Sequence, residues 1–302
     1  MIAISIKKDR VGFLSAFYSK SEIIVNDFGI FPLKSNFFNS EIISQILNRK
    51  KIKNSNNISK KCIICIDSDE VFFNQIHSSK KVDSETLVQW INNLMFGGTQ
   101  SDKYNDFHYE IFDKKGLLSV YIDKNKQLDY YGFCKESGLN LSCLSVDIFS
   151  AEYLAREMFE AKGSRDYLVW AVGKQKDDMI IVRDNNFIGL VSFKRLKNNI
   201  EIIKCVGSEK YISDCLDKMS QKSFTDLQSV DFVKKIYMYQ KCHLSTDMKK
   251  IVKKNKDVVT VLNPLLKIDS FKKGKNEDIN SSFLSEMGYL FKIIKERGQI
   301  DD

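Results

Sequence analysis

The sequence predicts an α/β protein made of two related halves. Runs of strand length rich in Ile, Val and Phe alternate with amphipathic segments of helix length along the 302 residues. Each half begins with two strands joined by a tight turn, at residues 2–17 and 167–193. Alternating helices and strands follow both hairpins, so the chain carries a weak internal repeat of α/β character.

In the first half, Ile-rich strand patterns and one amphipathic segment define the elements. Strands are predicted at 2–6, 11–17, 22–28 and 62–67. A helix is expected at 40–48, because four apolar side chains recur there at the spacing of one helix face. The basic, Asn-rich segment 48–61 is predicted to be an exposed loop.

A regular block at about 71–147 is predicted to be an insert subdomain in the first half. Its expected order is strand, helix, strand, strand, helix, strand, with the first helix beginning near Asp83 and ending at Gly97–Gly98. The block carries more aromatic side chains than a small sheet can readily hide, and surplus aromatics tend to anchor interfaces. We expect the partner-binding residues to include Phe72, Phe73, Trp90, Phe107 and Tyr109.

The second half begins near Asp147, which gives two expected domains at 1–147 and 148–302. A helix is predicted from Ile148 to a C-cap at Gly163. The expected strands lie at 168–173, 178–183, 187–193, 200–206, 233–240 and 257–264. The remaining helices are expected at 208–220, 244–254 and 282–296.

Composition and charge favour a cytoplasmic protein. No apolar run approaches the roughly 18–20 residues that span a bilayer, and charged residues at 7–10 stand where a signal peptide needs its apolar centre. Seven Cys, an odd number found mostly in strand-like runs, fit a reducing compartment. The net charge of +8 comes with no nucleic-acid-binding motif, so no nucleic-acid partner is expected.

Three features could carry chemistry, and for each we favour a structural interpretation. Cys62 and Cys65 fall within one strand, where side chains three positions apart point to opposite faces, so we expect both to be buried, reduced and metal-free. The three His residues are isolated from any ligand cluster. The pair Asp177–Asp178 lies in the turn of the second hairpin and is expected to be solvated. No catalytic residue and no metal site is therefore predicted.

Three motifs carry a resemblance to a known family. Gly138–Leu139 follows a predicted helix, Val146–Asp147 ends a strand before a long helix, and Asn263–Pro264 follows the penultimate strand. Together with the order of elements and the terminal segment SEMGYLFKII, this pattern resembles the PilM family of type IV pilus assembly proteins. It is also similar to the cytoplasmic domain of GspL from type II secretion and, more distantly, to FtsA. The resemblance implies an actin-like ATPase fold of the ribonuclease H-like type.

The resemblance also implies where nucleotide would bind, and there the chain departs from the family. The family's two phosphate turns carry Asp-x-Gly, whereas the matching triplets here are Ser5-Ile6-Lys7 and Ala171-Val172-Gly173. The family's glycine run for adenosine is replaced by Gln240-Lys241-Cys242-His243. We therefore expect no bound cofactor and solvated lysine side chains at these turns. The degenerate turn residues are Ser5, Lys7, Ala171 and Gly173, and the lysines are Lys7, Lys8 and Lys174.

These expectations favour a non-enzymatic scaffold of a type IV pilus or type II secretion platform. The resemblance implies a cytoplasmic protein at the face of the inner membrane that binds the cytoplasmic tail of a PilN-like membrane partner. An ATP-binding PilM-like protein with unusual phosphate turns is the alternative. A small-molecule kinase of the same superfold is a third hypothesis, but it requires a catalytic Asp beside a Gly-rich turn, and the sequence offers none.

Overall fold

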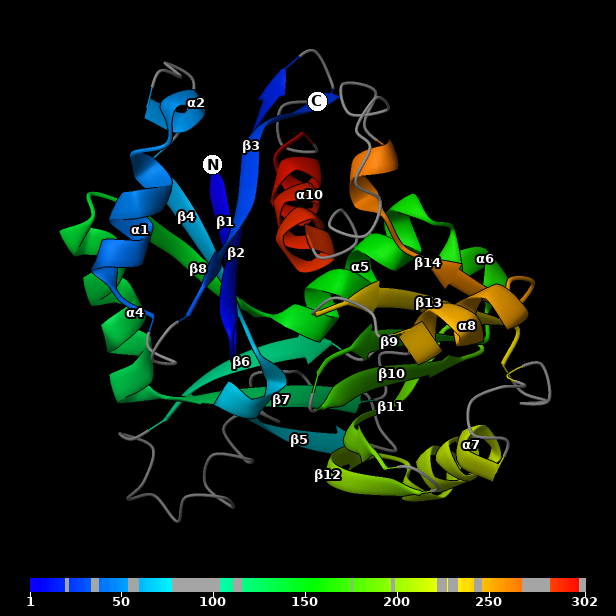
Figure 1. Cartoon of the computed structure of the whole chain (residues 1–302). Coiled ribbons are helices and arrows are strands. Elements are labelled where there is room, and N and C mark those ends of the chain that lie inside the picture. Colours follow the sequence, from blue (N-terminus) through cyan, green and yellow to red (C-terminus); the bar gives the residue numbers. More distant parts are fainter. Residues whose placement is uncertain are drawn as a thin grey trace.

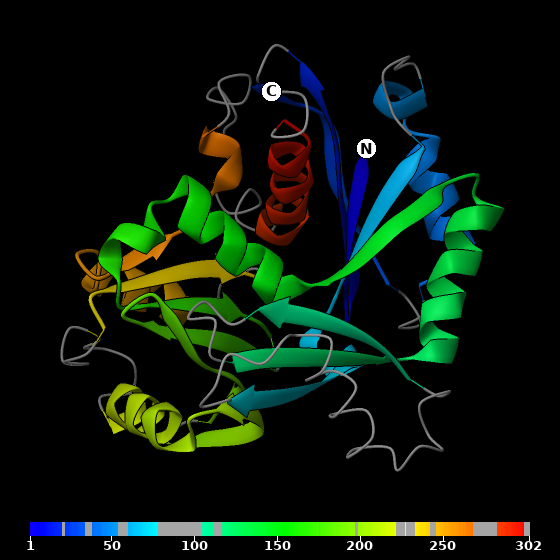
Figure 2. The same cartoon turned by 180° about the vertical axis from the view of Figure 1, so that it is seen from behind.

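In the computed structural model, two β-sheets and a smaller third sheet are surrounded by short helices (Figure 1). The same arrangement is seen from behind in Figure 2. The structure describes residues 1–19, 22–33, 38–53, 60–77, 104–110, 116–174, 176–196, 199–221, 227, 233–241, 246–267 and 283–298.

The first sheet has five strands in the order β3-β2-β1-β4-β8. Strands β1, β2 and β3 form an antiparallel meander, and β4 and β8 continue the sheet from β1 in parallel. The bounds are β1 Ile2–Lys7, β2 Arg10–Ser19, β3 Glu22–Pro32, β4 Lys61–Ile66 and β8 Asn140–Val146. The three strands predicted at the N-terminus are confirmed, and each is longer than expected.

Helices cover both faces of this sheet. Cys62 and Cys65 of β4 are both fully buried but contact different helices, because side chains three positions apart on a strand point to opposite faces. Cys62 faces Cys134 of α4 (Lys124–Glu136), which packs beside α1 (Ser40–Leu47). Cys65 lies 3.9 Å from the Ser150 hydroxyl of α5 (Asp147–Met158). The expected burial on opposite faces is confirmed.

The segment 48–61, predicted to be a loop, contains one helical turn, α2 (Lys50–Lys53).

The second sheet has six strands in the order β12-β11-β10-β9-β13-β14. Its bounds are β9 Tyr167–Val172, β10 Asp177–Arg183, β11 Asn186–Arg195, β12 Ile200–Gly207, β13 Lys235–Gln240 and β14 Val259–Val261. Three helical segments accompany it, α6 Ala161–Ser164, α7 Glu209–Gln221 and α8 Thr246–Lys254, with the 3-10 turn η3 Pro264–Lys267 after β14.

The internal repeat is visible in the strand order of the two sheets. In each, an antiparallel meander of three strands is extended by two parallel strands on the side of its first strand. Strand β9 therefore corresponds to β1, and β13 corresponds to β4. Strand β12 is an addition at the outer edge of the second sheet. Every residue of β9 is buried, because helices or the first half cover both of its faces.

The predicted insert is smaller than expected. Strands β5 (Val71–His77), β6 (Tyr104–Glu110) and β7 (Gly116–Asp123) form a separate antiparallel sheet in the order β5-β7-β6. Strand β8, which the sequence assigned to the insert, belongs instead to the first sheet, where it pairs with β4 along its whole length, and helix α4 packs against it. The helix expected between Asp83 and Gly98 lies outside the described residues.

The C-terminal helix α10 (Leu284–Gly298) returns to the first half and packs against α5 (Figure 1). A Cβ on Gly288 would lie 2.0 Å from the Ser150 carbonyl oxygen, so only glycine permits this close helix contact. The strands of the first sheet lie before the expected division at 147/148 and those of the second sheet lie after it, whereas α10 also contacts β1, β2 and β4 of the first sheet. Helix α5 also ends earlier than predicted, at Met158, and Glu160 has a positive φ of 58°. No helix in the described part of the chain is long and apolar enough to cross a membrane.

Candidate functional site

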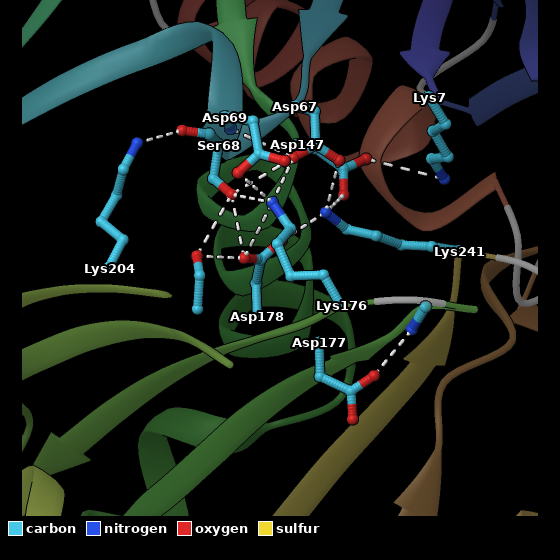
Figure 3. A network of polar contacts seen from close by, with 12 residues as sticks. Lys7, Asp67, Ser68, Asp69, Asp147, Lys176, Asp177, Asp178, Lys204 and Lys241 are labelled. Carbon is cyan, nitrogen blue, oxygen red and sulfur yellow. Dashed lines mark hydrogen bonds and ion pairs between the residues drawn. The ribbon is translucent and has the colours of Figure 1, made fainter. Parts of the chain in front are cut away.

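The two hairpin turns that the sequence assigned to phosphate binding lie on either side of one polar cluster (Figure 3). Lys7 ends β1 at the first turn, and Lys176 directly precedes β10 at the second. Strands β4 and β13 also end there, followed directly by Asp67 and Lys241. The carboxyl ends of such strands are where open α/β sheets bind ligands. The lysine–aspartate cluster consists of Lys7, Asp67, Asp69, Asp147, Lys176, Asp178 and Lys241.

Lys241 lies at the centre of the cluster. Its Nζ is 2.9 Å from Asp67 Oδ2 and 3.5 Å from Asp147 Oδ2. It also donates a hydrogen bond to Asp178 Oδ2. Burial alone would lower the pKa of Lys241, but the three surrounding carboxylates outweigh it and hold that pKa well above its usual value. The central lysine is therefore charged throughout the physiological pH range.

Lys176 contacts the other oxygens of the same carboxylates. Its Nζ lies 2.7 Å from Asp67 Oδ1 and 3.4 Å from Asp178 Oδ1. It also lies 2.7 Å from Asp69 Oδ1 and donates to the Ser68 hydroxyl at 2.9 Å. Burial opposes ionisation of Asp67, yet Lys241 and Lys176 together hold the pKa of its carboxyl far below the usual range. Asp67 and Asp178 therefore each bridge two ammonium groups.

Asp147, the first residue of α5, connects the cluster to the first hairpin. Its Oδ1 lies 3.7 Å from Lys7 Nζ, and its Oδ2 accepts a hydrogen bond of 2.8 Å from the Tyr239 hydroxyl. Burial raises the pKa of this carboxyl, but Lys7 and Lys241 outweigh that effect and the pKa is lowered. Lys7 is buried, so its expected solvation is wrong; the carboxylate of Asp147 compensates for the loss of water.

The expected solvation of Asp177 and Asp178 is also wrong, since both are buried at the start of β10. Asp178 faces the cluster. Asp177 points the other way and accepts hydrogen bonds from Arg195 Nε at 2.6 Å and Trp170 Nε1 at 3.0 Å. It also accepts from the backbone N–H of Gly173 at 3.0 Å. Neighbouring strand residues point to opposite faces, so one Asp pair supplies two different networks.

A third lysine from the second half reaches the segment between β4 and β5. Lys204 of β12 donates to the carbonyl oxygens of Ser68 and Val71, each at 2.7 Å. Its Nζ also lies 5.1 Å from the centre of the Phe73 ring. Lysines from β12, from the β9–β10 turn and from the end of β13 thus all bind the first half between residues 67 and 71.

The cluster does not fit a metal ion with a nucleotide. A hydrated metal needs carboxylate oxygens that face it, and phosphates need free backbone N–H groups at the turn. Here lysine ammonium groups lie on the carboxylate oxygens of Asp67, Asp147 and Asp178. The Gly173 N–H is taken by Asp177, and a Cβ at this glycine would lie 2.0 Å from the Lys176 carbonyl oxygen. Gly173 therefore shapes the turn.

The remaining predicted turn residues are structural in their contacts. Ser5 is buried and donates its hydroxyl hydrogen to Glu286 of α10, and Ala171 is buried within β9 opposite Asp178. Lys8 and Lys174 are exposed, as predicted.

The predicted partner-binding residues have different environments. Phe72 is 59% exposed, whereas Phe73 is half-buried with its ring 5.9 Å from that of Phe149. Phe107 and Tyr109 belong to β6. Trp90 lies outside the described residues.

The central residues of the cluster were missed in the sequence. Asp67 and Lys241 each follow directly after a buried strand, at the edge where two corresponding strands end. The position of each residue directly after one of two corresponding strands was the sequence signal that could have identified them. Their partners are 63 to 174 residues away, so no local spacing relates them.

No family model matches the sequence, and no curated protein matches it. Among solved structures, a chain of the PilM–PilN type IV pilus biogenesis complex matches with a TM-score of 0.65 at 9% identity, over 95% of this chain and 96% of that one. The chain has the actin-like ATPase fold. This establishes the α/β fold class that the sequence predicted.

Two further structures are similar at lower scores. A Bacteroides thetaiotaomicron protein with an actin-like ATPase fold and unknown function matches with a TM-score of 0.49 at 13% identity, covering 94% of this chain and 95% of that one. The cytoplasmic domain of EpsL, an inner membrane component of the Vibrio cholerae type II secretion system, matches with a TM-score of 0.43 at 8% identity. That match covers 89% of this chain and 98% of the EpsL domain.

Proposed function

We propose that the chain is a non-enzymatic, actin-like scaffold that binds neither ATP nor a metal ion between its halves. The observation that supports this most strongly is the lysine–aspartate cluster. It joins both halves through side chains at the two turns where a relative with intact Asp-x-Gly motifs would hold phosphates. Ion pairs that are part of the chain keep the halves together without a dissociable ligand.

The scaffold serves an assembly platform of a type IV pilus or a type II secretion system. It acts at the cytoplasmic face of the inner membrane, where it binds the cytoplasmic tail of a membrane protein of the PilN type. Support comes from the fold match to a chain of the PilM–PilN complex, which spans almost the whole of both chains. At 9% identity that match establishes the fold, and the partner is our inference.

The small sheet β5-β7-β6 is the proposed docking surface for this tail. Among the described large apolar side chains, Phe72 of β5 is the most exposed, at 59%. Its neighbour Phe73 points inward, where Lys204 holds the base of the strand to the second half. An exposed aromatic side chain on a strand with a fixed base is suited to anchor an incoming peptide.

One observation favours the second candidate function, an ATP-binding protein with unusual phosphate turns. The two hairpins do face each other across one site, as they would around a nucleotide. For this function the ion pairs of Lys241 would have to separate before phosphate could enter.

Peptide binding tests the proposed scaffold function. The probe is a labelled synthetic peptide of the cytoplasmic tail of a PilN-type membrane protein from the same genome, titrated by fluorescence anisotropy. Phe72→Glu is expected to weaken binding at least tenfold. Leu196→Glu is the matched control, because Leu196 is similarly exposed at 51% but lies after β11 in the second half. Undiminished binding by Phe72→Glu refutes the docking surface, and no binding by the unaltered chain refutes the proposed partner.

A further inference from the structure

We propose that Lys241 is a built-in cation: its ammonium group occupies a cation site formed by Asp67, Asp147 and Asp178, and shortening this lysine leaves a site for a divalent metal ion. The proposal deepens the metal-independent part of the proposed function, on which it rests. It concerns no nucleotide and no partner, so it can fail independently of them.

Three carboxylates from three separate elements converge on one nitrogen. Asp67 follows β4, Asp147 begins α5, and Asp178 lies in β10. One oxygen of each faces Lys241 Nζ, at 2.9 Å for Asp67 and 3.5 Å for Asp147, with a hydrogen bond to Asp178. Convergent carboxylate oxygens from rigid elements are the arrangement that binds hard divalent cations in proteins. In this structure the position between the three carboxylates is occupied by the ammonium group of Lys241, which is part of the chain.

Charge explains why some cation must be there. Asp147 and Asp178 are at most 1% exposed, and bringing such buried carboxylates together without a positive partner is strongly unfavourable. Lys7 and Lys176 supply two positive charges against three negative ones, and Lys241 supplies the third. Without Lys241 the three carboxylates keep one uncompensated negative charge, even before the exposed Asp69 is counted.

The position of Lys241 also explains why the contact between the two halves does not depend on a dissociable ion. Its Nζ contacts Asp67 in the first half and Asp178 in the second, so one ammonium group joins both. A metal ion in that place would dissociate when its concentration fell. A side chain fixed to the end of β13 remains at a high local concentration whatever the ionic conditions. The closed arrangement of the halves is therefore independent of divalent ions.

The test uses Lys241→Ala and the unaltered chain, without nucleotide. Mn²⁺ binding is followed by electron paramagnetic resonance and by calorimetry, and Tm is measured in millimolar MnCl2 and in EDTA. We expect the unaltered chain to have the same Tm in both and to bind no Mn²⁺ at this site. Lys241→Ala is expected to melt lower in EDTA, to bind one Mn²⁺ per chain, and to regain part of the lost Tm in MnCl2.

Two further variants make the result specific. Adding Asp178→Asn to Lys241→Ala removes one of the three carboxylates and is expected to weaken Mn²⁺ binding at least tenfold. Lys174→Ala changes an exposed lysine of the same β9–β10 turn and is expected to behave like the unaltered chain. If Lys241→Ala does not fold, Lys241→Gln, which keeps most of the volume, is purified and titrated in its place. A folded Lys241 variant that binds no Mn²⁺, or an unaltered chain that binds it equally well, overturns the proposal.

Discussion

Replacing Asp178 by Asn should destabilise the protein far more than the same replacement at Asp184. Asp178 is fully buried and neutralises Lys241 and Lys176, while the hydroxyls of Ser68 and Ser192 donate to it. The amide has nearly the same shape but no charge. Two buried ammonium groups then lose one of their shared partners.

The expected cost follows from burial. Removing one partner of a buried ion pair costs about 3–5 kcal/mol, because the other charge stays in the interior uncompensated. At roughly 2–4 °C of Tm per kcal/mol for a large domain, Asp178→Asn should lower Tm by about 6–20 °C. Asp184 pairs with Arg165 at 2.9 Å with 59% and 63% of their side chains exposed, so its replacement should cost under about 1 kcal/mol.

Thermal melts and urea titrations of both variants measure the difference. The urea midpoint of Asp178→Asn should fall with little change in slope, which reports a loss of stability without a change in the surface exposed on unfolding. Asp184 has a positive φ of 50°, a conformation that Asn tolerates well, so its variant controls for the chemistry of the substitution without adding strain. Equal destabilisation by the two variants would refute the claim that the cluster is buried and coupled.

Three further outcomes follow from the packing, the buried acid and the thiols. Gly288→Ala should lower the free energy of unfolding by about 1–3 kcal/mol in urea titrations, because the added Cβ would lie 2.0 Å from a backbone oxygen. Gly132→Ala in helix α4 should raise it by roughly 0.5–1 kcal/mol, because no atom lies within 4 Å of the added Cβ. Burial raises the pKa of Glu286, so its contribution to stability is complete below the unfolded pKa of about 4.3 and is lost as pH rises through the folded pKa. Glu286→Gln should remove that loss, and the stability difference between variant and parent should grow with pH above about 4; a pH-independent difference contradicts this assignment. In the folded chain a thiol reagent should label the exposed Cys205 rapidly and the buried Cys65 slowly, and equal rates by mass spectrometry would show the first sheet to be open.

Much of the fold could be predicted because its signals are local. The strands at both hairpins follow from β-branched runs bounded by turn residues, and the two-sided burial of Cys62 and Cys65 follows from alternation along one strand. The internal repeat follows from the order of these elements. Prediction failed where the local sequence pattern does not show which strand a segment pairs with. Strand β8 reads like the strands of the insert, yet it pairs with β4, about 80 residues earlier in the sequence.

The position of the candidate site could be predicted from the sequence, but the burial and the ion pairs of its side chains could not. The two hairpin turns that the sequence singled out lie on either side of the lysine–aspartate cluster. The prediction that Lys7 and the Asp177–Asp178 pair are solvated used the ordinary preference of charged turn residues for water. That preference fails when opposite charges from distant segments arrive together. Lys241 contacts carboxylates that are 63, 94 and 174 residues away in the sequence, and no local spacing pattern predicts contacts over such separations.

Calorimetric titration of the unaltered chain with ATP and Mg²⁺ tests the central claim most directly. If the chain's own lysines close the site between the halves, no heat of binding is expected at millimolar nucleotide, and Tm should be the same with and without Mg-ATP. Saturable binding with a micromolar Kd that depends on Mg²⁺ would contradict the account, because it would require the carboxylates around Lys241 to be free for a metal ion.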